Sequence, residues 1–407
     1  MKILLVNKFF YLKGGSEQVF FDEGRLLEER GHKVVFFSMQ NSKNFPSEYK
    51  RYFISNVDYE KGKLKDEIGA SLKLLYSFEA NRKMEQLIKQ ERPDVAHLHN
   101  IYHQISPSVL HSLKKYRIPV VMTLHDYKMV CASYLLFAGG RPCEACTGER
   151  YYNCFLKACV KDSRAKSFLN TVEMYLHHKM LRIYELVDVC ISPSKFVKHK
   201  LEQMAFKGKI IHLPNFIKCD ETINPQFSAG KKSIVYFGRL SSEKGLFTLL
   251  EAVKGLDVIL KIIGVGPAEE NLKLKAKNEK LNNINFLGYR IGEELKDEIT
   301  KCMFAVLPSE CYENNPRSVI EAFALGKPAI GARIGGIPEL VKDNVTGLTF
   351  KAGDINDLRE KIKQLINSPD KIIEMGKNAR AFVEQELNPE KHYRGLMEIY
   401  RRIEHLT

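Results

Sequence analysis

Two glutamates separated by seven residues mark the segment of this sequence that is richest in chemistry. Glu313 and Glu321 lie within residues 308–330, which read PSECYENNPRSVIEAFALGKPAI. Apolar residues just before this segment predict a buried strand, and Asn315 and Pro316 are typical cap and first-turn residues of a helix. The free N–H groups of a helix that begins at the carboxyl end of a parallel strand bind phosphate. The segment therefore predicts an anion site with carboxylates beside it.

Glu321 lies inside the predicted helix, which is otherwise apolar on most sides and is expected to be buried. A buried carboxylate is costly unless it is hydrogen-bonded or paired. Spacing alone leaves two interpretations open. Glu321 is either a functional residue, or a residue that faces solvent or forms a structural ion pair.

Cationic side chains follow the first strand predicted in the second half of the chain. In FGRLSSEKG, residues 237–245, Gly238 permits a tight exit from the strand, Arg239 offers a planar fork of donors, and Lys244 adds a point charge. This combination suits a diphosphate leaving group, whose negative charge grows as a glycosidic bond breaks. A surface location of both cations is the alternative interpretation.

A glycine pair, Gly14 and Gly15, lies between the first predicted strand and the first predicted helix, with Ser16 as the expected cap. Glycines let the backbone approach a ligand closely, and a helix N-terminus binds phosphate. A plain strand-to-helix turn also explains the pair.

Two later strands end in HLHN and TLHDY, and we expect His97 and His99 of the first motif to be packed at the strand end.

Short apolar runs alternate with helical periodicity through both halves of the chain. This pattern predicts parallel sheets covered by helices on both faces, the doubly wound α/β class. The expected strands are residues 2–6, 33–38, 95–98, 120–124, 187–191, 233–237, 258–263, 284–287, 304–307 and 328–331, and the first expected helix is 17–30. The expected domains are residues 1–213, with a cysteine-rich insertion at 131–159, and 233–388, separated by a linker at 214–232 and followed by a packed polar helix at 389–407.

The composition is that of a folded enzyme, with 44% hydrophobic and 28% charged residues. The first residues lack the length and cleavage site of a signal peptide, and no apolar stretch approaches the roughly 18 residues of a membrane-spanning helix, so we predict a cytoplasmic protein. The formal charge of +14 gives a positive field, which attracts nucleic acid, an anionic membrane surface or phosphorylated ligands. No arginine-rich arm or finger-spaced Cys/His set supports nucleic acid. Peripheral attachment to the inner face of the membrane and a merely solvated basic surface both stay open.

Five of the nine cysteines crowd between residues 131 and 159. Without a signal peptide, thiols are expected to be free or metal-bound. The C-x2-C and C-x4-C spacings predict a structural zinc bound by Cys143, Cys146, Cys154 and Cys159, with Cys131 as a replacement for one of them. Reduced thiols without a metal are the alternative.

The pair Glu313 and Glu321, followed by Ala322, Gly326 and Pro328, resembles the E-x7-E motif of the retaining GT-B glycosyltransferases of family 4. The FGRLSSEKG and KGGSE motifs occur in the order typical of this family, so the resemblance covers nearly the whole chain. It implies two Rossmann-like domains that face a cleft. The N-terminal domain is then the acceptor side, and the C-terminal domain binds the nucleotide sugar.

The resemblance also implies roles for single residues. Arg239 and Lys244 clamp the diphosphate, Glu321 holds the ribose hydroxyls, Glu313 contacts the donor sugar, and His125 contacts the sugar or the acceptor. The implied catalytic residues are thus Glu313, His125, Arg239 and Lys244. The implied donor-binding residues are Gly14, Gly15, Gly238, Arg239, Lys244, Gly264, Gly266, Tyr289, Asn314, Asn315, Pro316 and Glu321. Gly264, Gly266 and Tyr289 lie where the family holds the nucleobase, although tight turns explain these segments equally well.

The expected function is retaining transfer of a sugar from a nucleotide-diphosphate sugar to a glycan or lipid-linked acceptor, in cell-surface polysaccharide synthesis. No Asp-x-Asp motif appears where a donor-bound cation would need it, so no catalytic divalent metal is expected. A sugar-nucleotide epimerase of the same architecture is one alternative, and it would turn over the donor without an acceptor. A non-catalytic protein that binds glycan or nucleic acid is the other, and the intact set of glutamates and cations argues against it.

Overall fold

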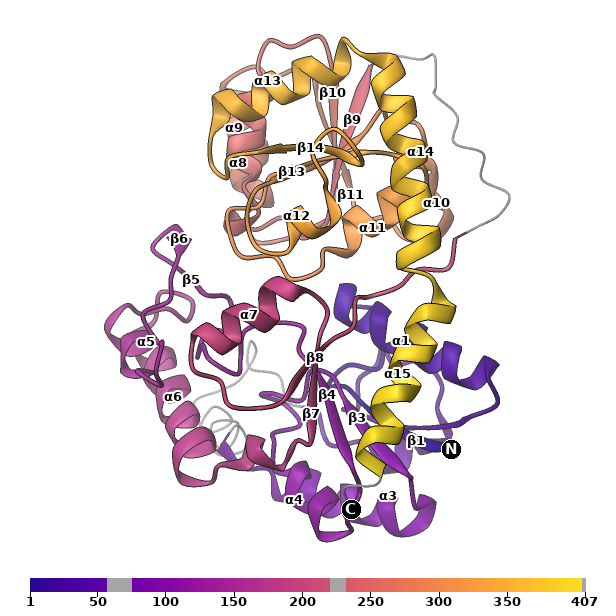
Figure 1. The fold of residues 1–407 in the computed structure, drawn as a ribbon. Helices are drawn as coiled ribbons and strands as arrows, with labels where there is room; N and C mark the ends of the chain where they lie inside the picture. The colour runs from indigo at the N-terminus through magenta and orange to yellow at the C-terminus, as the bar shows by residue number, and fades with distance from the viewer. Residues whose placement is uncertain (57–74, 220–231, 405–407) are drawn as a thin grey trace. The chain divides into compact units, whose positions relative to one another are not determined.

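The computed structural model describes residues 1–56, 75–219 and 232–404. The chain divides into two compact units (Figure 1). The first unit comprises Met1–Leu135, Glu144–Pro214 and His392–Thr407, and the second comprises Leu136–Cys143 and Asn215–Lys391. Most of the expected linker, residues 220–231, and the end of the expected last helix, residues 405–407, lie outside the described residues.

A six-stranded parallel sheet forms the centre of the first unit, in the order β2-β1-β3-β4-β7-β8. Its strands are β1 (Lys2–Val6), β2 (Lys33–Phe37), β3 (Val95–Leu98), β4 (Val120–Thr123), β7 (Val189–Ser192) and β8 (Ile210–His212). Strands β3, β4 and β7 are buried at every position, as in parallel sheets that helices cover on both faces. The order reverses beside β1 and is therefore doubly wound.

The helices of the first unit connect these strands and also form an insertion between β4 and β7. The connecting elements are α1 (Gly15–Glu29), η1 (Glu48–Tyr52), α3 (Phe78–Glu91), α4 (Val109–Lys115) and α7 (Lys195–Gln203). The insertion contains α5 (Tyr152–Leu156), α6 (Arg164–Tyr175), the π-helical turn η2 (Leu176–Met180) and η3 (Ile183–Leu186). A short antiparallel hairpin, β5 (Phe137–Ala138) with β6 (Arg141–Pro142), belongs with the second unit.

The C-terminal helix α15 (Pro389–Glu404) packs beside α1 of the first unit (Figure 1). It buries an apolar stripe that includes Leu396, Tyr400 and Ile403. Its His392 shares a hydrogen bond of 3.1 Å between Nε2 and Oε1 of Glu23 in α1. The helix therefore completes the first unit rather than standing as a separate element.

The second unit repeats the architecture, with a parallel sheet in the order β11-β10-β9-β12-β13-β14. The strands are β9 (Ser233–Phe237), β10 (Ile259–Ile263), β11 (Ile284–Gly288), β12 (Ala305–Leu307), β13 (Ala329–Ala332) and β14 (Gly347–Phe350). The helical elements are η4 (Ser242–Lys244), α8 (Leu246–Val253), α9 (Glu269–Asn278), α10 (Gly292–Thr300), α11 (Arg317–Ala324), α12 (Ile337–Leu340), α13 (Ile355–Ile366) and α14 (Pro369–Glu386). Helix α8 packs against α13, and α11 packs against α14.

Both units thus have the doubly wound α/β architecture that the sequence predicts. The structure adds two edge strands, β8 and β14, that the sequence did not predict. Within residues 1–56, 75–219 and 232–404, every helix is too short or too polar to cross a lipid bilayer.

Candidate functional site

An ion pair between Lys244 and Glu313 lies at the carboxyl ends of β9 and β12 in the second unit. Nζ of Lys244 donates to Oε1 of Glu313 at 2.6 Å, and the hydroxyl of Ser309 donates to the same oxygen at 2.6 Å. Burial alone would lower the pKa of Lys244, but the Glu313 carboxylate raises this pKa above its ordinary value. The sequence-predicted cation is therefore charged and held in place.

Glycines allow the three loops around this ion pair to approach one another. Gly245, at φ +66°, ends η4, and a Cβ added there would overlap the carbonyl oxygen of Pro308. Gly335, at φ +61°, follows β13, and a Cβ there would overlap the backbone of Glu313. The next residue, Gly336, donates its N–H to the Glu313 carbonyl oxygen at 2.8 Å. Loop residues from β9, β12 and β13 thus meet at Glu313.

Arg239 lies in the exposed loop after β9, where its own carbonyl accepts a hydrogen bond of 2.8 Å from the Tyr236 hydroxyl. Among the residues that the structure describes, its guanidinium has no ion-pair or hydrogen-bond partner. Glycines at 264 and 266 pack against this loop, because a Cβ at Gly264 would overlap the Gly238 carbonyl and a Cβ at Gly266 would overlap the Leu240 carbonyl. Close backbone packing therefore explains these two glycines, as the tight-turn interpretation expects.

Helix α11 begins one residue later than predicted. Its cap is Pro316, which has no side-chain cap hydrogen bond, so the prediction of Asn315 as the cap was wrong. The Asn315 side chain instead accepts the N–H of Asn215 at 3.3 Å. Nε of Arg317 donates to Oε1 of Glu321 at 2.9 Å, one helical turn away, and Glu321 is half-buried. Glu321 therefore forms the ion pair that one of the two interpretations expects.

The remaining predicted donor residues of the second unit flank these loops. Asn314 is half-buried and lies between Glu313 and the start of α11. Tyr289 follows β11 and its side chain is exposed.

In the first unit, Gly14 is the N-cap of α1 and has an extended backbone. A Cβ added to it would make only an ordinary contact, 3.6 Å from Oε2 of Glu17. The predicted cap by Ser16 was wrong, because the Ser16 hydroxyl donates to Oε1 of Glu17 at 3.2 Å. Neither packing within the described residues nor a positive φ demands a glycine at position 14.

A buried network of histidines lies at the carboxyl ends of β3 and β4. Nδ1 of His99 and Nε2 of His125 share a hydrogen bond of 2.9 Å, and Nε2 of His99 lies 3.2 Å from Oε2 of Glu23. Burial lowers the pKa of His125 to about 3, so its imidazole is neutral at neutral pH. Burial alone would raise the pKa of Glu23, but His97 and His99 hold it well below the ordinary value. The ionised Glu23 carboxylate therefore contacts His99, which in turn is hydrogen-bonded to His125.

His97 stacks on His99, and its Nδ1 lies 3.5 Å from the same Oε2 of Glu23. Its Nδ1 lies 2.8 Å from the Tyr400 hydroxyl of α15, and its Nε2 lies 2.7 Å from Oγ1 of Thr123. Glu23, His97 and His99 have ligand atoms within 4.8 Å of one another, which is close enough to hold a metal ion. Hydrogen bonds to Tyr400 and Thr123 already engage both ring nitrogens of His97, while Glu23 and His99 face each other at ion-pair distance.

Charged residues that sequence reasoning missed surround the same strand ends. Asp126 follows His125 and accepts the Tyr102 hydroxyl at 2.7 Å and the Lys128 N–H at 2.9 Å. Burial raises the pKa of Asp126 and of Glu17, and burial lowers the pKa of Lys8. The signal available in the sequence was the position of Lys8 and Asp126 just after predicted strands.

Three of the five clustered cysteines lie near one another in the insertion. Cys146 and Cys154 lie in a small apolar core, and Cys159 packs against it. Among the described residues, the group whose ligand atoms already lie close enough to hold a metal ion is Glu23, His97 and His99, which contains no cysteine. The zinc site of Cys143, Cys146, Cys154 and Cys159, with Cys131 as a replacement, stays a prediction.

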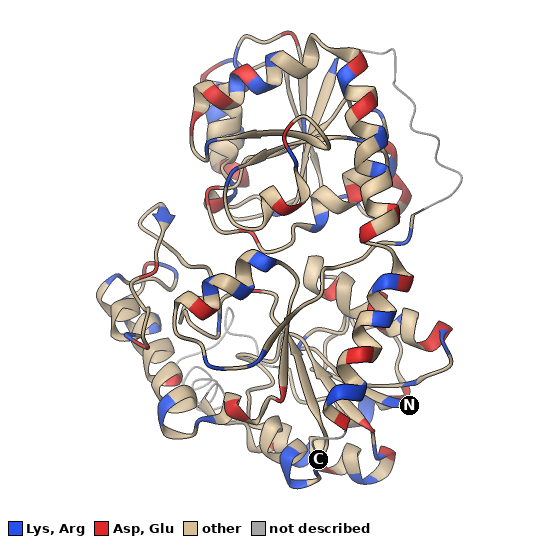
Figure 2. Ribbon diagram, in the orientation of Figure 1, with Lys and Arg blue, Asp and Glu red and all other residues tan. Residues whose placement is uncertain are grey.

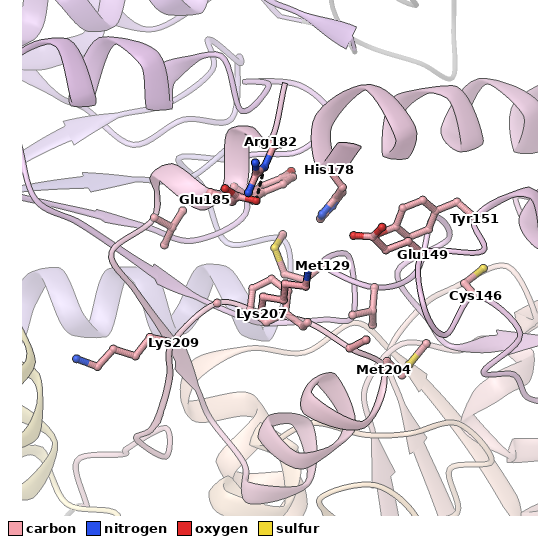
Figure 3. Close-up of a pocket in the computed structure, with 16 residues that line it drawn as sticks. Met129, Cys146, Glu149, Tyr151, His178, Arg182, Glu185, Met204, Lys207 and Lys209 are labelled. Atoms are coloured by element: carbon pink, nitrogen blue, oxygen red, sulfur yellow. Dashed lines mark hydrogen bonds and ion pairs between the residues drawn. The ribbon is translucent and has the colours of Figure 1, made fainter. Parts of the chain in front are cut away.

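A cavity of about 420 Å³ lies beside the insertion in the first unit (Figure 3). Its walls include the aromatic rings of Tyr151 and Tyr184 and the polar side chains of His178 and Arg182. Nε of Arg182 donates to Oε1 of Glu185 at 2.7 Å. One residue of the predicted zinc site, Cys146, lines this cavity. The predicted donor-binding residues do not line it.

The chain is similar in sequence to known glycosyltransferases. A family model described as Glycosyltransferase Family 4 matches residues 13–221, and a model described as Glycosyl transferases group 1 matches residues 220–382. An uncharacterized glycosyltransferase of Methanocaldococcus jannaschii is 26% identical over 406 residues, which cover 99% of each chain. An amylovoran biosynthesis glycosyltransferase of Erwinia amylovora is 28% identical over 240 residues, which cover 54% of this chain and 58% of that protein.

Among solved structures, HepE of Anabaena in complex with UDP and glucose matches with a TM-score of 0.68 at 17% identity, covering 99% of this chain and 100% of that chain. At this identity the match concerns the fold. The two parallel sheets with their helices are the two Rossmann-like halves of the GT-B fold.

Proposed function

Because this chain belongs to glycosyltransferase family 4, we propose that it transfers a sugar from a nucleotide-diphosphate sugar to a glycan or lipid-linked acceptor, with retention of the anomeric configuration. The chain is a glycosyltransferase, and its relative in Erwinia amylovora is named for amylovoran biosynthesis. The donor class and the stereochemistry are the parts that we propose. The UDP and glucose bound to HepE support a nucleotide sugar as donor.

One observation carries the proposal for the donor site. The charged ammonium of Lys244 is fixed by Glu313 at the end of β9, and the guanidinium of Arg239 is exposed in the same loop. Two such cations can bind the diphosphate and stabilise the charge that develops on it as the glycosidic bond breaks. A donor phosphate would then replace the Glu313 carboxylate as a partner of Lys244, which frees Glu313 to contact the transferred sugar.

The remaining roles follow from the same donor position. We assign Glu321 to the ribose hydroxyls. Its carboxylate is half-buried, lies one turn from the start of α11, and can accept hydrogen bonds from two hydroxyls. Gly264, Gly266 and Tyr289 are assigned to the nucleobase side, and Asn314, Asn315 and Pro316 to the phosphate side. Since Gly14 has no packing reason to lack a side chain, we assign Gly14 and Gly15 to close approach by the donor.

His125 is assigned to contact with the transferred sugar or the acceptor. The hydrogen bond that its Nε2 shares with Nδ1 of His99 leaves Nδ1 of the neutral ring for a ligand hydroxyl. With two cations at the diphosphate, we propose that transfer needs no divalent metal.

A donor screen with several nucleotide sugars tests the function directly. We expect one nucleotide sugar to raise the melting temperature and to be consumed only when an acceptor is supplied. NMR of the new linkage should show the donor's anomeric configuration. Donor consumption without an acceptor, with an epimerised product, would establish the epimerase alternative instead, and an inverted linkage would refute the retaining mechanism.

A further inference from the structure

Helix α6 of the insertion has its polar face inside. Ser167, Asn170 and Thr171 are buried on the same side as Met174, whereas Phe168 is 56% exposed and Val172 is 37% exposed. A helix that only supports a fold shows the opposite distribution, with apolar residues inside. Packing among the described residues therefore does not explain the apolar face of α6.

A buried charge fixes this orientation of the helix. Oε2 of Glu173, on the inner face of α6, lies 2.5 Å from Nζ of Lys128 and 3.7 Å from Nε2 of His103. Oε1 of Glu173 lies 3.3 Å from Nδ1 of His177. Rotating α6 to hide Phe168 would separate a buried carboxylate from its partners, which is strongly unfavourable. Exposure of the apolar face is thus built into the fold.

The exposed apolar surface continues onto the neighbouring elements. Helix α5 packs against α6, and the rings of Phe155 and Phe168 lie 5.8 Å apart, edge to face. Leu156 is 63% exposed and Met180 is 77% exposed. The full apolar set is Tyr152, Phe155, Leu156, Phe168, Val172, Met180 and Leu181. Soluble proteins seldom expose so many large apolar side chains together without a partner.

Cations flank this apolar set. Residues 150–182 contain seven Lys or Arg and two acidic residues, Asp162 and the buried Glu173. Lys179 and Arg182 pair with Glu149 and Glu185, which lie just outside this range. The cations are all exposed: Arg150, Lys157, Lys161, Arg164, Lys166, Lys179 and Arg182. Figure 2 draws Lys and Arg in blue and Asp and Glu in red. Along one face of α6 and η2, Arg164 and Lys179 lie at the two ends of the stripe formed by Phe168, Val172 and Tyr175.

We propose that residues 150–182, the insertion surface, dock this protein on an anionic lipid bilayer. The aromatic and aliphatic side chains would enter the boundary between headgroups and acyl chains, while the flanking Lys and Arg extend to the phosphates. A bilayer offers a uniformly negative plane with an apolar interior, which complements a surface that is apolar at its centre and basic around it. Docking does not depend on the proposed sugar transfer, because it requires no turnover.

Flotation of the full chain with lipid vesicles tests this proposal. We expect binding to vesicles that contain phosphatidylglycerol, little binding to pure phosphatidylcholine, and loss of binding at high salt. The double variant Phe168→Ser with Val172→Ser should lower partitioning at least tenfold. Each of Arg164→Gln, Lys166→Gln and Lys179→Gln should lower it about fivefold, since one Lys or Arg near such a surface contributes about 1 kcal/mol.

Matched variants separate docking from misfolding. Ile373→Ser and Lys377→Gln, exposed on α14 of the second unit, should float like the unaltered chain. If the Phe168 and Val172 variant fails to fold, as circular dichroism would show, the more exposed pair Leu156→Ser and Met180→Ser replaces it. Equal flotation of the surface variants and the unaltered chain would overturn the proposal, as would binding to neutral vesicles that is equally strong. A dimer in solution that the Leu156 and Met180 variant dissociates would assign the surface to self-association instead.

Discussion

The buried histidines of the first unit should make it unstable in weak acid. His97 is fully buried at the centre of the network, and burial lowers its pKa to about 3. In an unfolded chain the pKa of a histidine is about 6.5. Because the folded pKa lies below the unfolded one, the unfolded chain binds more protons below about pH 6.5. Stability should therefore fall as the pH drops from about 6.5 towards about 3.

The magnitude follows from the difference between these two pKa values. Between about pH 7 and about pH 5, proton linkage at His97 alone should lower the free energy of unfolding by about 2 kcal/mol. For a unit of this size, that change corresponds to about 4–8 °C in melting temperature. His103, His125 and His178 have pKa values lowered in the same way, so the total effect should be larger. Glu23 and Glu173, with lowered pKa values, should add a further loss at more acidic pH.

Thermal unfolding measured by circular dichroism across this pH range checks the reasoning. His97→Gln should unfold at a lower temperature at neutral pH, because it disturbs contacts to Tyr400 and Thr123, but its melting temperature should vary less with pH. His199→Gln, at an exposed position of α7, is the matched control and should keep the slope of the unaltered chain. A melting temperature that is constant from pH 7 to pH 5 would refute the argument, and so would an undiminished slope in His97→Gln.

Four further predictions concern the second unit and its chemistry. Lys244→Met should lower kcat about 10²–10³-fold in a donor-consumption assay, whereas Lys254→Met, on the exposed surface, should not; equal rates would remove Lys244 from the donor site. Glu321→Gln should raise the KM for the donor about tenfold or more with a smaller change in kcat, and an unchanged KM would contradict a ribose contact. Gly335→Ala should destabilise the second unit by at least about 1–2 kcal/mol in urea unfolding, since φ is positive and the Cβ overlaps Glu313; a neutral result would contradict the close approach. EDTA should leave turnover unchanged, and a loss that Mg²⁺ restores would show that the two cations do not suffice.

The sequence predicts the strands at the centres of both sheets well, because these strands are buried on both faces and appear as apolar runs. Strand β9 is buried at every position, and its predicted bounds match the structure. The edge strand β8 is fully buried at one of its three positions, and in β14 Gly347 and Thr349 interrupt the apolar residues, so neither strand appears as a clear apolar run. Gly347 of β14 also lowers strand propensity, although a Cβ there would overlap the Ala329 carbonyl of the neighbouring strand. The close contact that requires glycine at position 347 can be recognised only from the structure.

The sequence likewise predicts only part of the candidate site. Motif spacing placed Lys244 and Glu313 after strands β9 and β12, and the structure brings them together. The Glu23, His97 and His99 network involves residues more than seventy positions apart and a helix from near the end of the sequence, so no local pattern could reveal it. The cysteine spacing predicts a metal site, and the structure groups Cys146, Cys154 and Cys159, but spacing alone cannot distinguish metal-binding thiolates from thiols that pack in a small core.

The return of α15 to the first unit affects how this protein is made. A ribosome synthesises residues 1–214 first, then residues 215–391 of the second unit, and only afterwards His392 and Tyr400. Until those side chains emerge, the nascent first unit carries Glu23 and His97 without two of their partners. The first unit can therefore complete its packing only after α15, which follows the second unit, has been translated. Until then, we expect the incomplete first unit to bind chaperones.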